Sequence, residues 1–274
     1  MSATRVYALP EWSCVAKAEV QRMRPREILR LTAQRPWPLP RGPWVMRQTW
    51  EALLFAHWPL APEALAPLLP TTLPPSALDT FEGQAWVGIV PFQMRGVRPR
   101  ALPAVPWLSA FPELNVRTYV TLDGRSGVYF FSLDAANPVA VALARRLLAL
   151  PYFTAAMRCL RDGDTIAYRS RTRHGGKPAV FEAHYHPVGP VFTARPGTLD
   201  YFLTERYCLY ASGSHGRVYR GEIQHGPWPL QLAEAEIAVN TLADSHGITL
   251  PDTPPLLHYA ARQEVLVWPP SRVQ

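Results

Sequence analysis

The stretch ELNVRTYVTLDGRSGVYFFSL, residues 113–133, contains the features that decide the fold. Asp123-Gly124 divides it into two runs, Glu113–Leu122 and Gly127–Leu133, which are rich in β-branched and aromatic residues. Both residues of the dipeptide tolerate positive φ, which tight hairpin turns require. The stretch therefore predicts an antiparallel β-hairpin.

Similar turn signals predict further antiparallel strands along the chain. Two more pairs are expected because glycine-bearing turns separate their members: Thr165–Arg173 with Ala179–Tyr185, and Tyr207–Ala211 with Arg217–Gln224. A fourth pair is expected within Leu78–Met94, around Glu82-Gly83. Single strands are expected at Gln48–Trp58 and Gln263–Trp268.

Helical patterns are few. The segments expected to be helical are Pro62–Leu69, Val139–Leu150 and Leu230–Ser245, and the last two have broad apolar faces. Strands and helices do not alternate as a doubly wound sheet requires. The sequence therefore predicts a mainly β fold with a few helices, arranged as an antiparallel sheet or barrel.

The 274 residues and the 48% share of hydrophobic residues suit one globular domain with a sizeable core. Residues 1–43 are rich in Pro and Arg and are expected to form an N-terminal extension, although a misassigned translation start would also explain them. Within it, residues 17–31 have the pattern of a short helix interrupted by Pro25. We expect residues 44–274 to form the single domain and the extension to contribute little to it.

The formal charge of +7 is concentrated near the start of the chain. Residues 1–50 hold nine Lys/Arg and three acidic residues, which leaves 19 basic and 18 acidic side chains for the other 224 residues. Because basic and acidic side chains nearly balance in residues 51–274, this part of the chain offers no basic face to a nucleic acid. No nucleic-acid partner is expected.

Cysteine usage and hydropathy indicate a cytoplasmic protein. Cys14, Cys159 and Cys208 are far apart and odd in number, and no CxxC pair suggests a zinc or redox site. No stretch reaches the roughly 18 consecutive apolar residues needed to cross a bilayer, and the first residues lack the order of a signal peptide. We expect no membrane association and no cofactor, and leave homo-oligomer formation open.

Polar and apolar residues alternate in the first strand of the decisive stretch. Because side chains alternate between the faces of a strand, Glu113, Asn115, Arg117 and Tyr119 share one face. Such a face can simply be exposed to water. However, a carboxylate, an amide, a guanidinium and a phenol in one row also suit a ligand pocket, and Asn is uncommon in strands. We expect this row to line a small-molecule pocket.

A metal site is conceivable at a second polar face. Glu182, His184 and His186 share one side of the expected strand, as ligands of a transition metal would. No further ligand can be named, and solvated or packed histidines explain the same pattern. We therefore expect no metal.

Three other segments allow two interpretations each. His57 and His225 could orient a ligand or be satisfied histidines of the core. Glu205-Arg206 could be a surface ion pair, or could bring a second carboxylate toward the pocket. Tertiary structure has to decide between these alternatives.

Several segments, taken in order, resemble the YqjF-like family of uncharacterised bacterial proteins, within the acetoacetate decarboxylase-like superfamily. The resemblance covers residues 45–268. The segments that carry it are LFAHW (54–58), VPF (90–92), ELNVRTYV (113–120), GVYFFSLD (127–134), LPY (150–152), TERY (204–207) and HGPW (225–228).

This resemblance implies a closed, mostly antiparallel β-barrel with a central cavity, but it does not imply a function. In the decarboxylases, a proline is followed by the lysine that forms a Schiff base with the β-keto acid. Here Pro151 is followed by Tyr152, and a phenol cannot form an imine. Lys177, in a glycine-bearing turn, is a poor substitute because an exposed amine stays protonated near pH 7.

Glu113 looks like the counterpart of the decarboxylases' pocket carboxylate. Two hypotheses follow. An enzyme would use Glu113 with Tyr152 and His57 on a small carboxylate, in a lyase- or hydrolase-like reaction without a Schiff base. A non-catalytic binding or sensor protein would keep the pocket alone. In both cases we expect a small organic acid or carbonyl compound, contacted by side chains of these residues: Asn115, Arg117, Tyr119, Glu205, Arg206 and His225.

Overall fold

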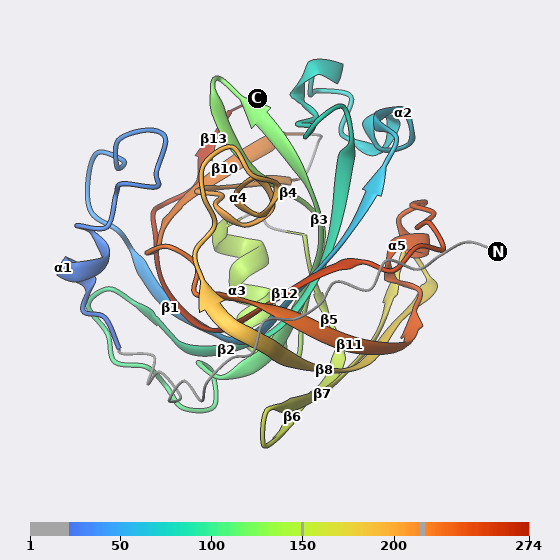
Figure 1. Cartoon of the computed structure of the whole chain (residues 1–274). Coiled ribbons are helices and arrows are strands. Elements are labelled where there is room, and N and C mark those ends of the chain that lie inside the picture. Colours follow the sequence, from blue (N-terminus) through green and yellow to red (C-terminus); the bar gives the residue numbers. More distant parts are fainter. Residues whose placement is uncertain (1–21, 149–150, 214–216, 274) are drawn as a thin grey trace.

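The computed structural model of the chain describes residues 22–148, 151–213 and 217–273 (Figure 1). Most of these residues lie in strands. The strands are β1 Met46–Leu60, β2 Ala85–Pro99, β3 Phe111–Leu122, β4 Arg125–Ala135, β5 Tyr152–Thr154, β6 Ala156–Asp162, β7 Thr165–His174, β8 Lys177–Phe192, β9 Cys208–Ser212, β10 Val218–Gln224, β11 Leu230–Asn240, β12 Leu256–Val267 and β13 Ser271–Arg272. The helices are α1 Pro25–Ile28, α2 Pro62–Leu65, α3 Pro138–Leu148, α4 Leu199–Thr204 and α5 Leu242–Ser245, with short 3₁₀ turns at Ala66–Leu68 and Pro75–Ala77.

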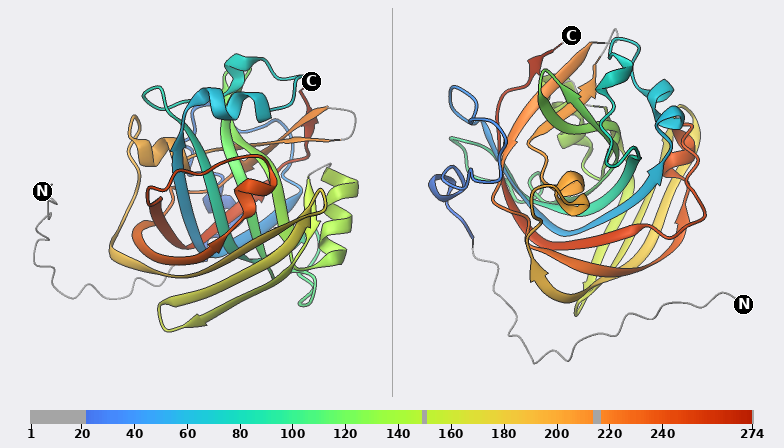
Figure 2. Two further views of the ribbon diagram at one scale, coloured as in Figure 1. Left: turned by 90° about the vertical axis from the view of Figure 1, so that its right-hand side faces the viewer. Right: turned by 45° about the horizontal axis from the view of Figure 1, so that its top comes forward.

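The strands pair in one sheet that turns back on itself. Its order is β13-β10-β9-β4-β3-β2-β1-β12-β11-β8-β7-β6, and β10 also pairs with β12, so that the strands from β10 to β12 form a ring. Most pairs are antiparallel, but β4 runs parallel to β5 and to β9. Beyond β12, the strands β11, β8, β7 and β6 continue as an outer layer, along the bottom of Figure 1. In the right-hand view of Figure 2, α4 (orange) is seen nearly end-on within the outline of the ring.

Three of the expected hairpins are confirmed. β3 and β4 pair from Glu113 with Ala135 to Leu122 with Arg125, and Asp123 and Gly124 have the positive φ values, 52° and 71°, of a primed turn. β7 with β8 and β9 with β10 form the other two pairs. The expected strands in β1 and β12 and the expected helices at α2 and α3 are confirmed as well, within the described residues.

Two expectations about secondary structure are wrong. Leu230–Ser245 is not one helix, because Leu230–Asn240 is strand β11 and only Leu242–Ser245 is helical. Burial alternates along β11, and its pairing with β8 overrides the helix propensity of its Ala and Glu residues. Leu78–Met94 does not form two strands. Leu78 makes an isolated bridge with Val120, and the strand begins at Ala85.

The main core lies between the ring and the outer layer. Leu114 and Val116, on the apolar face of β3, pack in one buried cluster with Tyr168, Phe181 and Tyr185. Strands β7 and β8 therefore cover this face. Because the apolar face of β3 points toward the outer layer, its polar face points into the ring. The fold thus positions the polar row at the centre of the molecule.

The described part of the N-terminal extension, residues 22–43, packs on the sheet. Pro25 is in the first turn of α1 and does not interrupt a helix. Ile28 is fully buried against Leu266 and Trp268, and the buried guanidinium of Arg35 pairs with Glu222 at 2.6 Å. These contacts argue against the expectation that the extension contributes little to the domain.

Candidate functional site

A cavity of about 80 Å³ lies inside the ring, beneath α4. Its polar wall comes largely from the row on β3, since Glu113, Asn115 and Arg117 all line it. The other lining residues come from seven further strands, from the end of α4 and from the segments after α4 and β10: Gln48, Trp50, Leu53, Phe55, Val90, Phe92, Val128, Phe130, Leu133, Tyr152, Thr204, Arg206, Leu209, Ile223, His225, Trp228 and Val267.

Glu113 is 3% exposed, and burial raises the pKa of its carboxyl to about 8. The hydroxyl of Tyr152 donates a hydrogen bond to Oε2 of Glu113 over 3.1 Å, which lowers this pKa in part. Burial, followed by the charge of Glu113, raises the pKa of Tyr152 well above its ordinary value. At pH 7 Glu113 is therefore mostly a neutral acid and Tyr152 a neutral phenol.

Arg117 is buried and has no carboxylate partner among the described residues. One of its terminal nitrogens donates to the backbone oxygen of Leu203 at 3.4 Å, Nε has no partner, and the guanidinium lies 5.2 Å from the centre of the Phe55 ring. Gly88, opposite Arg117 in the register of β2 and β3, makes room for it: a Cβ there would lie 3.2 Å from Nε. A buried cation without a counter-charge favours an anionic ligand.

Tyr119 and His57 lie beside the cavity but do not line it. The Tyr119 hydroxyl donates to the backbone oxygen of Leu203 over 2.9 Å and is 2.7 Å from Nε2 of His57. Burial lowers the pKa of His57 well below its ordinary value, and the charge of Arg117 lowers it further. His57 is therefore neutral at pH 7, and Nε2 donates no proton to a ligand while it bonds to Tyr119.

The neighbouring side chains of Glu205 and Arg206 contact different parts of the molecule. Arg206 lines the cavity and pairs with Asp79 at 2.7 Å, a partner 127 residues away that no local pattern indicates. Glu205 points elsewhere, accepting hydrogen bonds from the Tyr207 hydroxyl (2.6 Å) and the backbone N–H of Trp228 (2.9 Å). The carboxylate of this segment is not brought into the cavity.

His225 and Trp228 enter the cavity wall from the segment after β10. His225 stacks on Tyr207 with ring centres 4.6 Å apart. Trp228 was not singled out from the sequence as a site residue, although its HGPW segment carried part of the family resemblance. Its indole N–H is buried without a partner, as are Oδ1 of Asn115 and Nε of Arg117. Three residues that line the cavity thus carry a buried polar atom without a partner among the described residues.

The conceivable metal ligands lie on the outer layer and do not form a site. Glu182 pairs with Arg169 and Arg171 at 2.9 and 2.8 Å, and His184 is exposed. In the part of the chain that the structure describes, no group of three or more His, Cys, Asp or Glu side chains could hold a metal ion.

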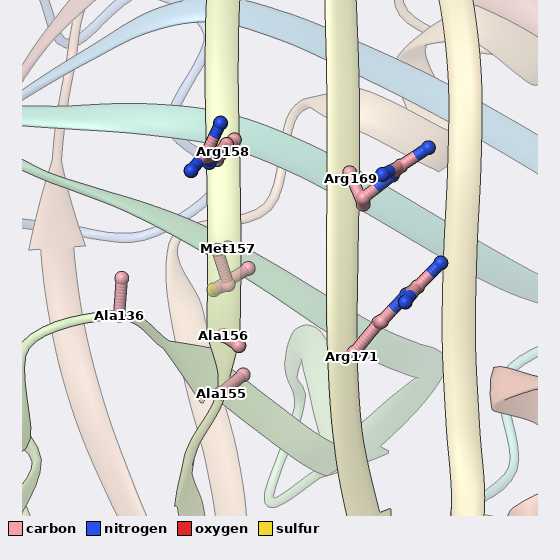
Figure 3. A pocket seen from close by; sticks show the side chains of 7 residues that line it. All are labelled: Ala136, Ala155, Ala156, Met157, Arg158, Arg169 and Arg171. Carbon is pink, nitrogen blue, oxygen red and sulfur yellow. The ribbon is translucent and has the colours of Figure 1, made fainter.

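A wide surface depression next to these residues is lined by three arginines (Figure 3). Arg169 and Arg171 extend in the same direction from β7, and Arg158 contributes from β6. All three are exposed, and the first two already share Glu182. Because water screens such charges, this depression is a weaker candidate than the buried cavity.

The ring and its cavity define the class of protein. The chain is similar to the enduracididine biosynthesis enzyme MppR complexed with pyruvate, with a TM-score of 0.58, 12% identity and coverage of 87% of this chain and 93% of that one. It is also similar to acetoacetate decarboxylase from Legionella pneumophila, with a TM-score of 0.54, 14% identity and coverage of 88% and 94%. The fold is that of the acetoacetate decarboxylase-like proteins.

Sequence comparison identifies the family within that fold. Residues 47–264 match the model of the DUF2071 family, described as "Uncharacterized conserved protein". The chain is 52% identical over 231 residues to "Uncharacterized protein YqjF" of Bacillus subtilis (strain 168), covering 84% of this chain and 93% of that protein. The chain belongs to the DUF2071 family, and the expected YqjF-like relationship is confirmed. Among the described helices, none is long and apolar enough to cross a membrane.

Proposed function

We propose that this protein binds a small organic acid in the cavity inside the ring, with the ligand carboxylate held by Arg117. The observation that carries this proposal is the buried guanidinium, which has no carboxylate partner in the residues that the structure describes. A planar guanidinium matches the two oxygens of a carboxylate, and the free indole N–H of Trp228 offers a further donor. Neutral Glu113 adds no negative charge that would repel the ligand.

The proposed site needs the ring to act as a closed barrel and residues 44–274 to act as one domain around it. The return pairing of β10 with β12 supports closure. The likeness to MppR complexed with pyruvate supports a small keto acid as one candidate ligand. Glu113, Asn115 and Arg117 are the proposed ligand contacts on β3, with Tyr152, Arg206 and His225 around them. A cytoplasmic location remains part of the same proposal.

Substitution of Arg117 tests the binding proposal. Arg117→Met replaces a buried cation by an apolar chain of similar length, so pyruvate binding measured by calorimetry should be lost. The melting temperature should stay the same or rise, because an uncompensated buried charge is removed. Arg169→Met, which removes an exposed arginine outside the cavity, is the matched control and should leave binding unchanged. Equal pyruvate binding by Arg117→Met and the unsubstituted chain would contradict the proposal.

Acid–base catalysis is the second candidate function, favoured by the Glu113 pKa of about 8. A carboxyl with such a pKa can both release and take up a proton near neutral pH. Among the described residues no lysine lines the cavity, because Tyr152 occupies the position after Pro151 and Lys177 is exposed at the start of β8. If Glu113 is a catalytic base, the protein should exchange the methyl protons of pyruvate with D₂O, as followed by ¹H NMR, and Glu113→Gln should not. Absence of exchange despite pyruvate binding would favour a binding or sensor protein.

A further inference from the structure

A second cavity, of about 230 Å³, adjoins the first one at Glu113. Its walls are mostly apolar, and it lies between β1, β2, the segment before β3 and helix α3. The residues that line this outer cavity are Met46, Gln48, Met94, Val97, Arg98, Pro99, Leu108, Phe111, Glu113, Ala135, Ala140, Val141, Leu143, Ala144 and Tyr152.

Three residues, Gln48, Glu113 and Tyr152, line both cavities and so form the wall between them. The hydrogen bond from the Tyr152 hydroxyl to Glu113 lies in this shared wall. The inner cavity, with about 80 Å³, has room for the polar head of an acid but for little more. Together the two cavities reach the ~300 Å³ at which small-molecule sites usually begin.

Small side chains keep the outer cavity open. Ala135 at the end of β4 and Ala140 and Ala144 on one side of α3 face it, where larger residues would fill the space. Asn137 holds the start of this helix in place by accepting hydrogen bonds from the backbone N–H groups of Val139 and Ala140. Leu143 lines the cavity and is nevertheless 46% exposed, so the cavity opens to solvent beside it.

We infer that the ligand of this protein is an organic acid with an apolar tail of several carbons. This inference rests on the proposed function. The carboxylate lies in the inner cavity at Arg117, and the tail extends past Glu113 and Tyr152 into the outer cavity. An acid as short as acetate or pyruvate fills only the inner cavity and gains nothing from the apolar walls.

A series of acids of increasing length tests the inference on the full chain. Dissociation constants for pyruvate, butanoate, hexanoate and octanoate are measured by calorimetry, each acid below its micellar concentration. Burial of the tail should tighten binding roughly threefold for each added methylene. Arg117→Met should abolish binding of every member, because all of them place the carboxylate at the same residue.

Two variants of α3 locate the tail. Ala140→Leu fills the outer cavity and should weaken octanoate more than tenfold relative to pyruvate. Ala142→Leu, on the exposed side of the same helix, is the matched control with the same change in helix propensity, and should leave the ratio unchanged. If all acids bind equally well and Arg117→Met abolishes them, the tail site is wrong and the proposed function stands. If no acid binds at all, the proposed function itself fails.

Discussion

The hydroxyl of Tyr152 donates a hydrogen bond to Oε2 of Glu113 over 3.1 Å, and so links β5 to the polar row of β3. This bond favours the ionised form of Glu113 and partly offsets the effect of burial on its pKa. Tyr152→Phe removes the bond, so the pKa of Glu113 should rise further. Titration of the ¹³C-labelled carboxyl by NMR measures the change, and a pKa that falls in the variant would contradict this assignment.

Glu113 should make the stability of the protein depend on pH. Its folded-state pKa of about 8 lies above the ordinary 4.5, so the folded state holds a proton that the unfolded state releases between these values. The stability contribution is therefore fully present below about pH 4.5 and is lost as the pH rises through 8.

Glu113→Gln keeps a neutral side chain at every pH and should remove this dependence. Relative to the unsubstituted chain, the variant should gain on the order of a few kcal/mol between pH 5 and pH 9. Urea unfolding at the two pH values measures the difference. Parallel pH profiles of the two proteins would show that Glu113 titrates normally.

Gly88 should be required for the position of Arg117 and His57. A Cβ at this position would lie 3.0 Å from the His57 ring and 3.2 Å from Nε of Arg117. Gly88→Ala should cost about 1–3 kcal/mol of stability and weaken acid binding, because both side chains must shift. Gly221→Ala on β10, where the nearest atom is 3.9 Å from the added Cβ, is the control. Equal melting temperatures of the two variants would contradict the close packing.

The described part of the N-terminal extension should contribute to stability. A chain that begins at residue 44 loses the buried side chain of Ile28 and leaves Glu222 without Arg35. Burial of Ile28 alone is worth about 1.5–3 kcal/mol, so this chain should melt roughly 5 °C or more below one that begins at residue 22. Calorimetry of both chains is the measurement. Identical melting curves would restore the interpretation of residues 22–43 as a dispensable arm.

No covalent imine should form with keto acids. Incubation with pyruvate or acetoacetate and borohydride, followed by intact mass, should show no adduct, because a phenol stands after Pro151 and Lys177 is exposed. An adduct mapped to Lys177 would overturn this expectation and would make a Schiff-base mechanism available to the enzyme hypothesis.

The sequence by itself determined the local features of the fold. Asp123-Gly124 specified a tight turn through its tolerance of positive φ, and the alternation from Glu113 to Val120 specified which side chains share a face. Both depend on neighbouring residues alone. Leu230–Asn240 shows where such reasoning ends, because its Ala and Glu residues favour a helix and its pairing with β8 makes it a strand.

Only the tertiary structure decided what the polar face of β3 points toward and which groups its side chains bond. Strands β7 and β8 cover the apolar face of β3, so that the opposite face, with Glu113 and Arg117, points inward. Asp79 pairs with Arg206, and Arg117 has no carboxylate partner in the described part of the chain; both results depend on residues that are distant in sequence. Alternation in the sequence assigns a side chain to one face of a strand. The pKa of Glu113 depends on its burial, and the uncompensated charge of Arg117 depends on its distance from carboxylates, and both arise only once the chain is packed.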